Sequence, residues 1–220
     1  MKQRSMLFKF SIALFLLPGG LYAQRDVPAA YNAAVKLNYV RLWDASAPEQ
    51  DPAVLPGRPL RDVKQSTQYF DGFGRPLQTV VKQGSVNSYN AANSPGFVPT
   101  VIDMVSAIEY DGFGREQVKY LSFASTATDA SKNDGSFKLN PFEQQASFYN
   151  NTDAVKNPII NQSETFFYGQ TKFEASPLNR VEESFAAGNS WASTITQPLE
   201  ADRKSIKTKY YFNTGNDVVR

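Results

Sequence analysis

The residues best suited to chemistry lie in a pentapeptide that occurs twice. Asp71-Gly72-Phe73-Gly74-Arg75 and Asp111-Gly112-Phe113-Gly114-Arg115 are identical. A carboxylate and a guanidinium held together in a turn could bind a sugar, and a suitably spaced pair of carboxylates could cleave a glycosidic bond. The motif therefore raises two hypotheses for Asp71, Arg75, Asp111 and Arg115, namely catalysis and carbohydrate binding.

The same residues also have a structural explanation. In a tight turn, Asp supplies an acceptor to backbone amides and glycine permits a positive φ. Asp-Gly between two strand-like runs indicates a hairpin. We also expect Phe73 and Phe113 to pack over the next hairpin, and each Arg to pair with an Asp of its own or an adjacent hairpin. We favour this interpretation for the repeat residues Tyr69, Asp71, Gly72, Gly74, Arg75, Tyr110, Asp111, Gly112, Gly114 and Arg115.

The composition excludes several kinds of site. The chain has no cysteine and no histidine, which rules out disulfides, thiol nucleophiles, Cys/His metal sites and His-dependent triads within it. Among its 21 acidic residues no pair stands out as the two carboxylates of a glycosidase. The loop from Asp129 to Gly135 is a poor calcium site, because Lys132 interrupts it and no Glu closes it. We predict no catalytic residue, metal or cofactor, and no enzyme activity.

The first 23 residues are predicted to be a secretory signal peptide. Lys2, Arg4 and Lys9 precede a short apolar run over residues 10–17, and Ala23 offers a cleavage point before Gln24. The run is shorter than the roughly 20 residues of a membrane span, so no span is expected after cleavage. We expect an exported protein at the cell surface, in the medium or in the periplasm.

The charge balance gives no indication of nucleic-acid binding. The whole chain carries a net charge of +2, but the predicted signal holds three of the cations and no acid. The mature chain is therefore close to neutral, whereas nucleic-acid recognition needs a concentrated basic surface.

The remaining chain divides into two predicted segments. Residues 24–60 are loop-rich, with one alternating strand over 35–43 and an extended polar loop over 44–52. Residues 61–220 are predicted to be a β-rich domain, truncated at its C-terminal end. Its expected elements are hairpins over 62–83 and 101–123, a short helix over 141–149, a degenerate third hairpin turning between Phe173-Glu174 and Arg180, and a strand over 206–212. Two Asn-x-Ser/Thr sequences, at 150–152 and 161–163, are interpreted as polar loops only.

Together these motifs resemble the YD repeats of Rhs proteins, through residues 69–83 and 110–116. More closely, the chain resembles the uncharacterised N-terminal domain of Rhs-repeat-associated core proteins from the Bacteroidetes lineage. Trp43 with residues 47–52, and the stretches 134–142 and 174–181, also match that domain. The resemblance covers residues 35–220. The two copies of the motif are about 40 positions apart, and periods of this size are typical of arrays of similar units.

The resemblance implies a mainly β fold of antiparallel YD-type hairpins, in an open or partial sheet or shell with long polar loops and at most short helices. In the family these hairpins spiral into a hollow shell around an effector, often a toxin. With only two clear repeats, this chain is expected to be the start or cap of a shell, or a truncated relative. The expected partner is the downstream Rhs repeat and core region of the same or a neighbouring polypeptide.

One alternative stays open from the residues themselves. The 16 Phe and 11 Tyr side chains could stack on sugar rings in a stand-alone adhesion or glycan-binding module at the cell surface. Aromatic residues at alternate positions of strands are, however, more typical of cross-strand packing.

Overall fold

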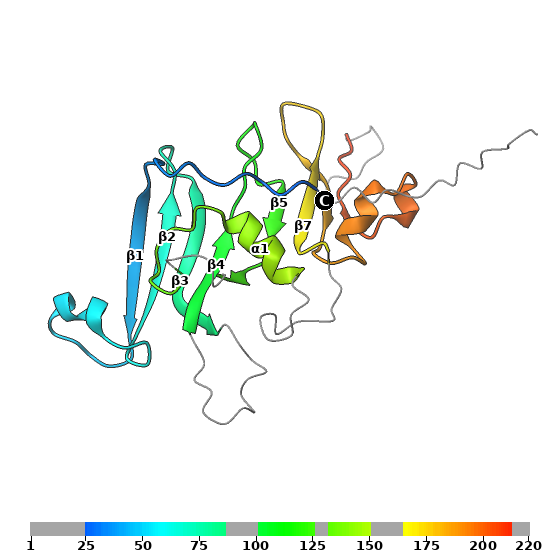
Figure 1. Cartoon of the computed structure of the whole chain (residues 1–220). Helices are drawn as coiled ribbons and strands as arrows, with labels where there is room; N and C mark the ends of the chain where they lie inside the picture. The colour runs from blue at the N-terminus through cyan, green and yellow to red at the C-terminus, as the bar shows by residue number, and fades with distance from the viewer. Residues whose placement is uncertain (1–24, 87–100, 126–131, 151–164, 213–220) are drawn as a thin grey trace, which may run out of the picture.

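A computed structural model describes residues 25–86, 101–125, 132–150 and 165–212 of the chain. The predicted signal peptide with its cleavage pair Ala23–Gln24, most of both Asn-x-Ser/Thr sequences and residues 129–131 of the acidic loop lie outside these ranges. The described part is mainly β, with two antiparallel sheets and short helices and no closed barrel (Figure 1), as the sequence predicted.

The first sheet contains five strands in the order β1-β2-β3-β4-β6, and every neighbouring pair is antiparallel. Alternate residues of β2 are buried, as its sequence pattern predicts. The strand predicted over 35–43 is displaced to 38–45, because its last residues pair with the start of β2. The five strands are β1 (Asn38–Ala45), β2 (Val63–Phe70), β3 (Pro76–Val86), β4 (Val101–Ala107) and β6 (Phe123–Ala124).

The second sheet has the order β5-β7-β8-β9. β7 and β8 form the predicted third hairpin. The predicted strand over 206–212 is shorter than expected, since only two of its residues form β9, and Thr208 adds one backbone bond to Glu182. The strands are β5 (Val118–Tyr120), β7 (Tyr168–Phe173), β8 (Val181–Phe185) and β9 (Ile206–Lys207).

The prediction of a regular second hairpin over 101–123 was wrong in one respect. Its return limb is divided between the sheets: Lys119 forms an isolated bridge to Ile108, and Phe123 pairs with Val105 in the first sheet. The other backbone edge of β5 pairs with β7, so Lys119 also lies opposite Gly169. This limb therefore joins the sheets, and the main strands follow one another in chain order across the molecule (Figure 1).

The helix α1 (Pro141–Tyr149) packs across the junction of the sheets (Figure 1), and it begins at the proline that predicted it. Tyr149 contacts both hydrophobic clusters, stacks on Phe167 with ring centroids 5.2 Å apart, and donates a hydrogen bond to the Ser122 carbonyl. The first cluster contains Tyr69, Val80, Val105 and Phe123, and the second contains Val118, Phe166, Phe167, Tyr168 and Ala192.

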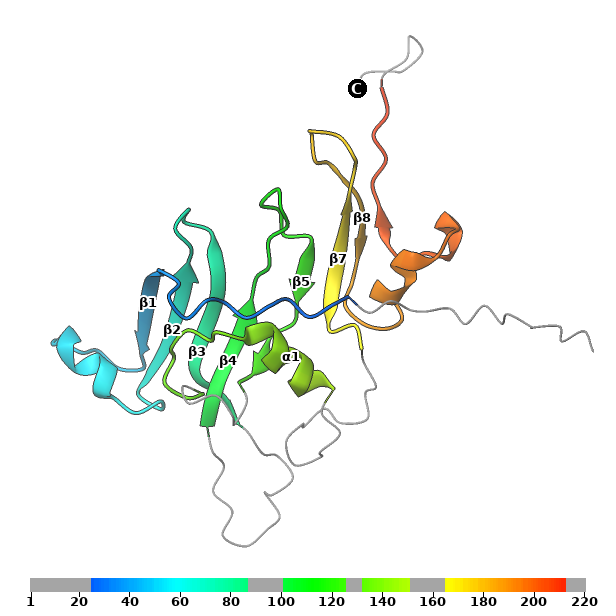
Figure 2. The same ribbon diagram turned by 45° about the horizontal axis from the view of Figure 1, so that its top comes forward.

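The segment 25–37 crosses the face of the molecule from the second sheet to β1 (Figure 2). Arg25 pairs with Glu109, and the Tyr31 amide donates to the Leu139 carbonyl at 2.7 Å. The Arg25 amide also donates to the Tyr168 hydroxyl of β7, and the Tyr31 hydroxyl donates to the Ile108 carbonyl just after β4, both at 3.4 Å. These contacts tie the beginning of the described chain to β7 and to the end of β4.

Three 3-10 helices lie in the connections of the described part of the chain. The extended loop predicted over 44–52 runs into the first of them, where the Asp51 side chain accepts a hydrogen bond from the Ala53 amide at 2.9 Å. They are η1 (Pro52–Gly57), η3 (Ala192–Thr196) and η4 (Glu200–Asp202). No helix among the described residues is long and apolar enough to cross a membrane.

Candidate functional site

The turn between β2 and β3 is closed by Asp71. One of its carboxylate oxygens accepts hydrogen bonds from the amides of Phe73 and Arg75, both at 2.9 Å. The other accepts from the Arg75 Nε at 2.8 Å. Gly74 has a φ of 78°, a conformation that glycine adopts without strain. The repeated carboxylate, glycine and arginine therefore form one self-contained turn.

The second motif repeats this geometry. Asp111 accepts hydrogen bonds from the Phe113 and Arg115 amides at 2.9 Å and from the Arg115 Nε at 2.7 Å. Gly114 has a φ of 77°. Gly72 and Gly112, at the turn tips, would meet no atom within 4 Å of an added Cβ. Only the second glycine of each motif, Gly74 or Gly114, adopts the positive φ that other residues rarely adopt.

The third, degenerate turn uses different residues for the same purpose. Glu174 pairs with the Arg180 guanidinium at 2.8 Å and accepts the Arg180 amide at 3.2 Å. Asn179, which precedes this arginine as glycine does in the other turns, has a φ of 51°. Asparagine is the residue besides glycine that most readily adopts this conformation, which explains how the turn survives without glycine.

Electrostatics keep all three carboxylates ionised. Desolvation works against the charge on Asp71 and Asp111, but hydrogen bonds from the following arginine and phenylalanine hold the pKa of each carboxyl below its usual value. The Arg180 guanidinium, with Ser176, lowers the pKa of Glu174 to about 2. A general acid needs a carboxyl that is protonated near neutral pH, so these groups are unsuited to that role.

The expectation that Phe73 and Phe113 pack over the next hairpin was wrong. These side chains are 88% and 81% exposed at the turn tips. The side chain that reaches the next unit is instead the arginine, whose planar guanidinium stacks on an aromatic ring. The Arg75 guanidinium lies 4.7 Å from the Tyr110 ring centroid.

The same contact occurs at each following turn. Arg115 lies 4.6 Å from the Phe173 ring centroid, and Arg180 lies 4.4 Å from that of Tyr210. We call these three arginine-to-aromatic contacts, each directed toward the C-terminus, the arginine ladder. It joins successive turns that lie along one rim of the molecule (Figures 1 and 2).

The two tyrosines of the repeat motif are not equivalent. Tyr69 is buried in the first sheet and donates its hydroxyl hydrogen bond to the Gly135 carbonyl at 2.8 Å. Tyr110 lies under Arg75 and donates to the Pro76 carbonyl at 2.9 Å. Tyr110 immediately precedes its Asp, whereas Phe70 holds that position in the first copy. Tyr69 therefore packs in the hydrophobic core, and Tyr110 forms part of the arginine ladder.

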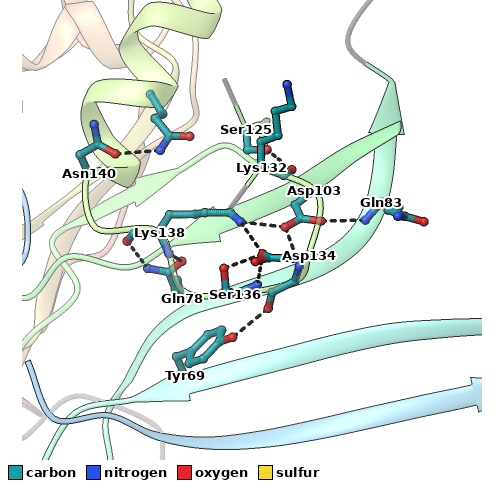
Figure 3. Close-up of polar contacts among 12 residues, drawn as sticks. Tyr69, Gln78, Gln83, Asp103, Ser125, Lys132, Asp134, Ser136, Lys138 and Asn140 are labelled. Carbon is teal, nitrogen blue, oxygen red and sulfur yellow. Dashed lines mark hydrogen bonds and ion pairs between the residues drawn. The ribbon is translucent and has the colours of Figure 1, made fainter. Parts of the chain in front are cut away.

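A buried polar network was missed by the sequence analysis (Figure 3). Asp103 and Lys138 are both fully buried, and the lysine ammonium lies 2.7 Å from the carboxylate. Asp103 also accepts hydrogen bonds from the amides of Gln83 and Gly135, both at 2.8 Å. The Gln78 amide exchanges two hydrogen bonds with the Lys138 backbone. These bonds anchor the loop 132–140 to β3 and β4.

The alternation of β4 was the available indication of this network, because Asp103 falls on the same face as Val105 and Ala107. Its partner could not be found from local spacing. Lys138 lies three residues after the loop that was considered for calcium, and its ammonium lies 3.8 Å from Asp134. The described residues contain no group of three or more acidic side chains that could hold a metal.

A charged cleft of about 450 Å³ lies beside β8 and β9. Its carboxylates are neutralised by neighbours: Glu183 pairs with Arg203 at 3.1 Å, and Glu200 pairs with Lys209 at 3.1 Å. These ion pairs organise the C-terminal part of the described chain.

Two antiparallel sheets, with turns of matching geometry between their strands, define a β-hairpin module. The model of the family described as "Domain of unknown function (DUF6443)" matches residues 42–205, and the chain belongs to this family. No curated protein and no solved structure matches the chain.

Proposed function

We propose that this chain is a non-enzymatic, exported module that starts or caps a YD-repeat β-shell of the Rhs type. The observation that carries the proposal is the arginine ladder, in which each turn binds an aromatic residue of the next unit. Such a contact gives the array a direction, because the arginine always belongs to the earlier unit. In this proposal the ladder and the hairpins hold the wall of the shell, and an effector would lie inside it.

The order of the strands supports growth at one end. The described chain begins its sheets at β1 and reaches β9 last, with each hairpin added beside the previous one. β9 lies at the edge of the second sheet, and Ile206 and Phe212 are 76% and 93% exposed. Unpaired strand edges with apolar side chains readily accept another strand. The proposed partner is therefore the next hairpin of a downstream repeat region, in the same or a neighbouring polypeptide.

A titration can test this partner. A synthetic peptide of residues 62–83, which contains one complete hairpin, is added to the ¹⁵N-labelled chain of residues 24–220. We expect chemical-shift changes concentrated at residues 206–212. The control peptide carries Asp71→Ala and Arg75→Ala, which remove the turn carboxylate and its arginine, and it should bind more weakly. Changes confined to β1, or equal binding of the two peptides, would contradict the proposed direction of growth.

A further inference from the structure

A second feature, independent of the repeat array, is a pocket of about 190 Å³ at the opposite end of the first sheet from the turns. One wall is the cross-strand pair Trp43 and Gln65, which lie opposite each other on β1 and β2. Lys82 and Gln83 of β3 form another wall. The last residues of η1 and those after it, from Leu55 through Leu60, also line the pocket. The η1 segment lies beside the end of β1 (Figure 1).

One polar group in this wall is buried without a partner. The indole N–H of Trp43 has no hydrogen-bond partner in the described residues. Gln65, a residue only 8% exposed, also lines the pocket and offers the donor and the acceptor of its side-chain amide. Burying a polar group without a partner is unfavourable. Such a group beside a cavity indicates a site for something that supplies the missing hydrogen bond.

The charges around the pocket favour an anion. Arg58 and Lys82 line it, and no carboxylate does among the described residues. Arg58 is paired with Glu49 at 2.6 Å, whereas Lys82 has no ion-pair partner in the described part of the chain. The Lys82 ammonium is therefore available to bind an anionic group of a ligand.

The wall is also rigidly held. The amide of Gln83, a non-glycine residue with a φ of 55°, is fixed by the buried Asp103 carboxylate at 2.8 Å. Asp103 also holds Gly135, where an added Cβ would lie 2.7 Å from the Gln65 side-chain nitrogen and 3.1 Å from the Lys82 Cβ. Backbone held in a strained conformation by its surroundings often occurs at binding sites. Through Gln83 and Gly135, the Asp103–Lys138 network therefore helps to shape the pocket.

We propose that this pocket binds a uronic acid unit of a polysaccharide. Its ring hydroxyls both donate and accept, so they would bond to both ends of the Gln65 amide, and with a small rotation of the indole they would accept from the Trp43 N–H. Its carboxylate would meet the Lys82 ammonium, and its apolar ring face would lie against the aromatic wall. A neutral hexose lacks the charged contact, and a simple carboxylate lacks the hydroxyls.

The test uses tryptophan fluorescence of the chain of residues 24–220. Trp43 and Trp191 are its two tryptophans, so in the Trp191→Phe variant the fluorescence comes from Trp43 in the pocket alone. Galacturonate and glucuronate are the probes, with galactose and N-acetylalanine as neutral and carboxylate-only controls. We expect saturable changes with a uronate, at least tenfold weaker binding of both controls, and loss of binding in Gln65→Leu. Lys82→Met should reduce uronate affinity to that of galactose.

Each other outcome overturns the proposal. No saturable change with either uronate in the folded Trp191→Phe chain would mean that the pocket holds only water. Equal affinity for N-acetylalanine would mean that it recognises a carboxylate without a sugar. Unchanged binding in both Gln65→Leu and Lys82→Met, each verified as folded by circular dichroism, would place the sugar elsewhere. Trp43→Phe provides a second measurement by calorimetry, since it keeps an aromatic wall and removes only the N–H and part of the ring.

Discussion

The guanidinium of Arg115, in the turn between β4 and β5, stacks on the ring of Phe173 at the end of β7 in the next hairpin, with 4.6 Å between the charged carbon and the ring centroid. Its Nη1 also donates to the Asn179 side chain at 2.6 Å, while its Nε stays on Asp111. One arginine thus closes its own turn and holds the next one. An ordinary surface ion pair joins only two side chains, whereas Arg115 contacts both its own turn and the next one.

The first prediction concerns this contact. Cation–π pairs at partly exposed sites contribute about 0.5–1 kcal/mol. A double-mutant cycle of Arg115→Ala and Phe173→Leu, measured by urea unfolding, should therefore give a coupling energy of that size. The comparison pairs Arg115→Ala with Phe113→Leu, whose ring also lies 5.0 Å from the same guanidinium but is 81% exposed at the turn tip, so a weaker coupling is expected. A coupling to Phe113 as large as that to Phe173 would mean that the ladder holds the turns together no better than a local contact.

The second prediction separates the two glycines of the motif. Gly114→Ala places a Cβ on a residue with a φ of 77°, and we expect it to destabilise the chain by about 1–2 kcal/mol. Gly112→Ala introduces a methyl group into open space and should change stability by less than about 0.5 kcal/mol. Thermal unfolding of both variants measures the difference, and equal effects would show that the turn does not depend on the left-handed residue.

The third prediction concerns the buried ion pair. Removing one member of such a pair leaves an uncompensated charge, so Lys138→Met should destabilise by about 3–5 kcal/mol. Adding Asp103→Asn to this variant should recover part of the loss. The control is Lys172→Met at an exposed pair with Glu182, expected to cost no more than about 1 kcal/mol. If Lys138→Met unfolds at the same urea concentration as the control, the network is not a structural anchor.

The fourth prediction concerns pH. Hydrogen bonds from the Arg180 side chain lower the pKa of Glu174 from 4.5 to about 2 in the folded state. Because the folded pKa is depressed, the stabilisation is fully present above pH 4.5 and is lost as pH falls through about 2. The difference in unfolding free energy between the native chain and Glu174→Gln should therefore shrink on acidification from pH 6 to pH 2. If this difference in unfolding free energy stays constant between pH 6 and pH 2, the stability of the turn does not depend on the charge of Glu174.

The hairpins and their turns could be predicted because their determinants are local. Asp71 and Gly74 act on residues within the same turn, and Pro141 marks the start of α1. The partners of Arg75 and Lys138 could not be predicted, since Tyr110 and Asp103 reach them only through the tertiary fold. The exposure of Phe73 could not be predicted for the same reason. The contact with the next hairpin that Phe73 was expected to make is made instead by the Arg75 guanidinium on Tyr110.

The most direct test of the central claim is backbone amide exchange of residues 206–212 in the isolated chain of residues 24–220. If this segment is the edge on which a further hairpin docks, its amides should exchange rapidly, with protection limited to the bonds of β9 and Thr208. β3 and β4, which lie inside the first sheet, should be strongly protected in the same sample. Protection of residues 206–212 equal to that of β4 would show a closed, self-sufficient domain and would contradict the account.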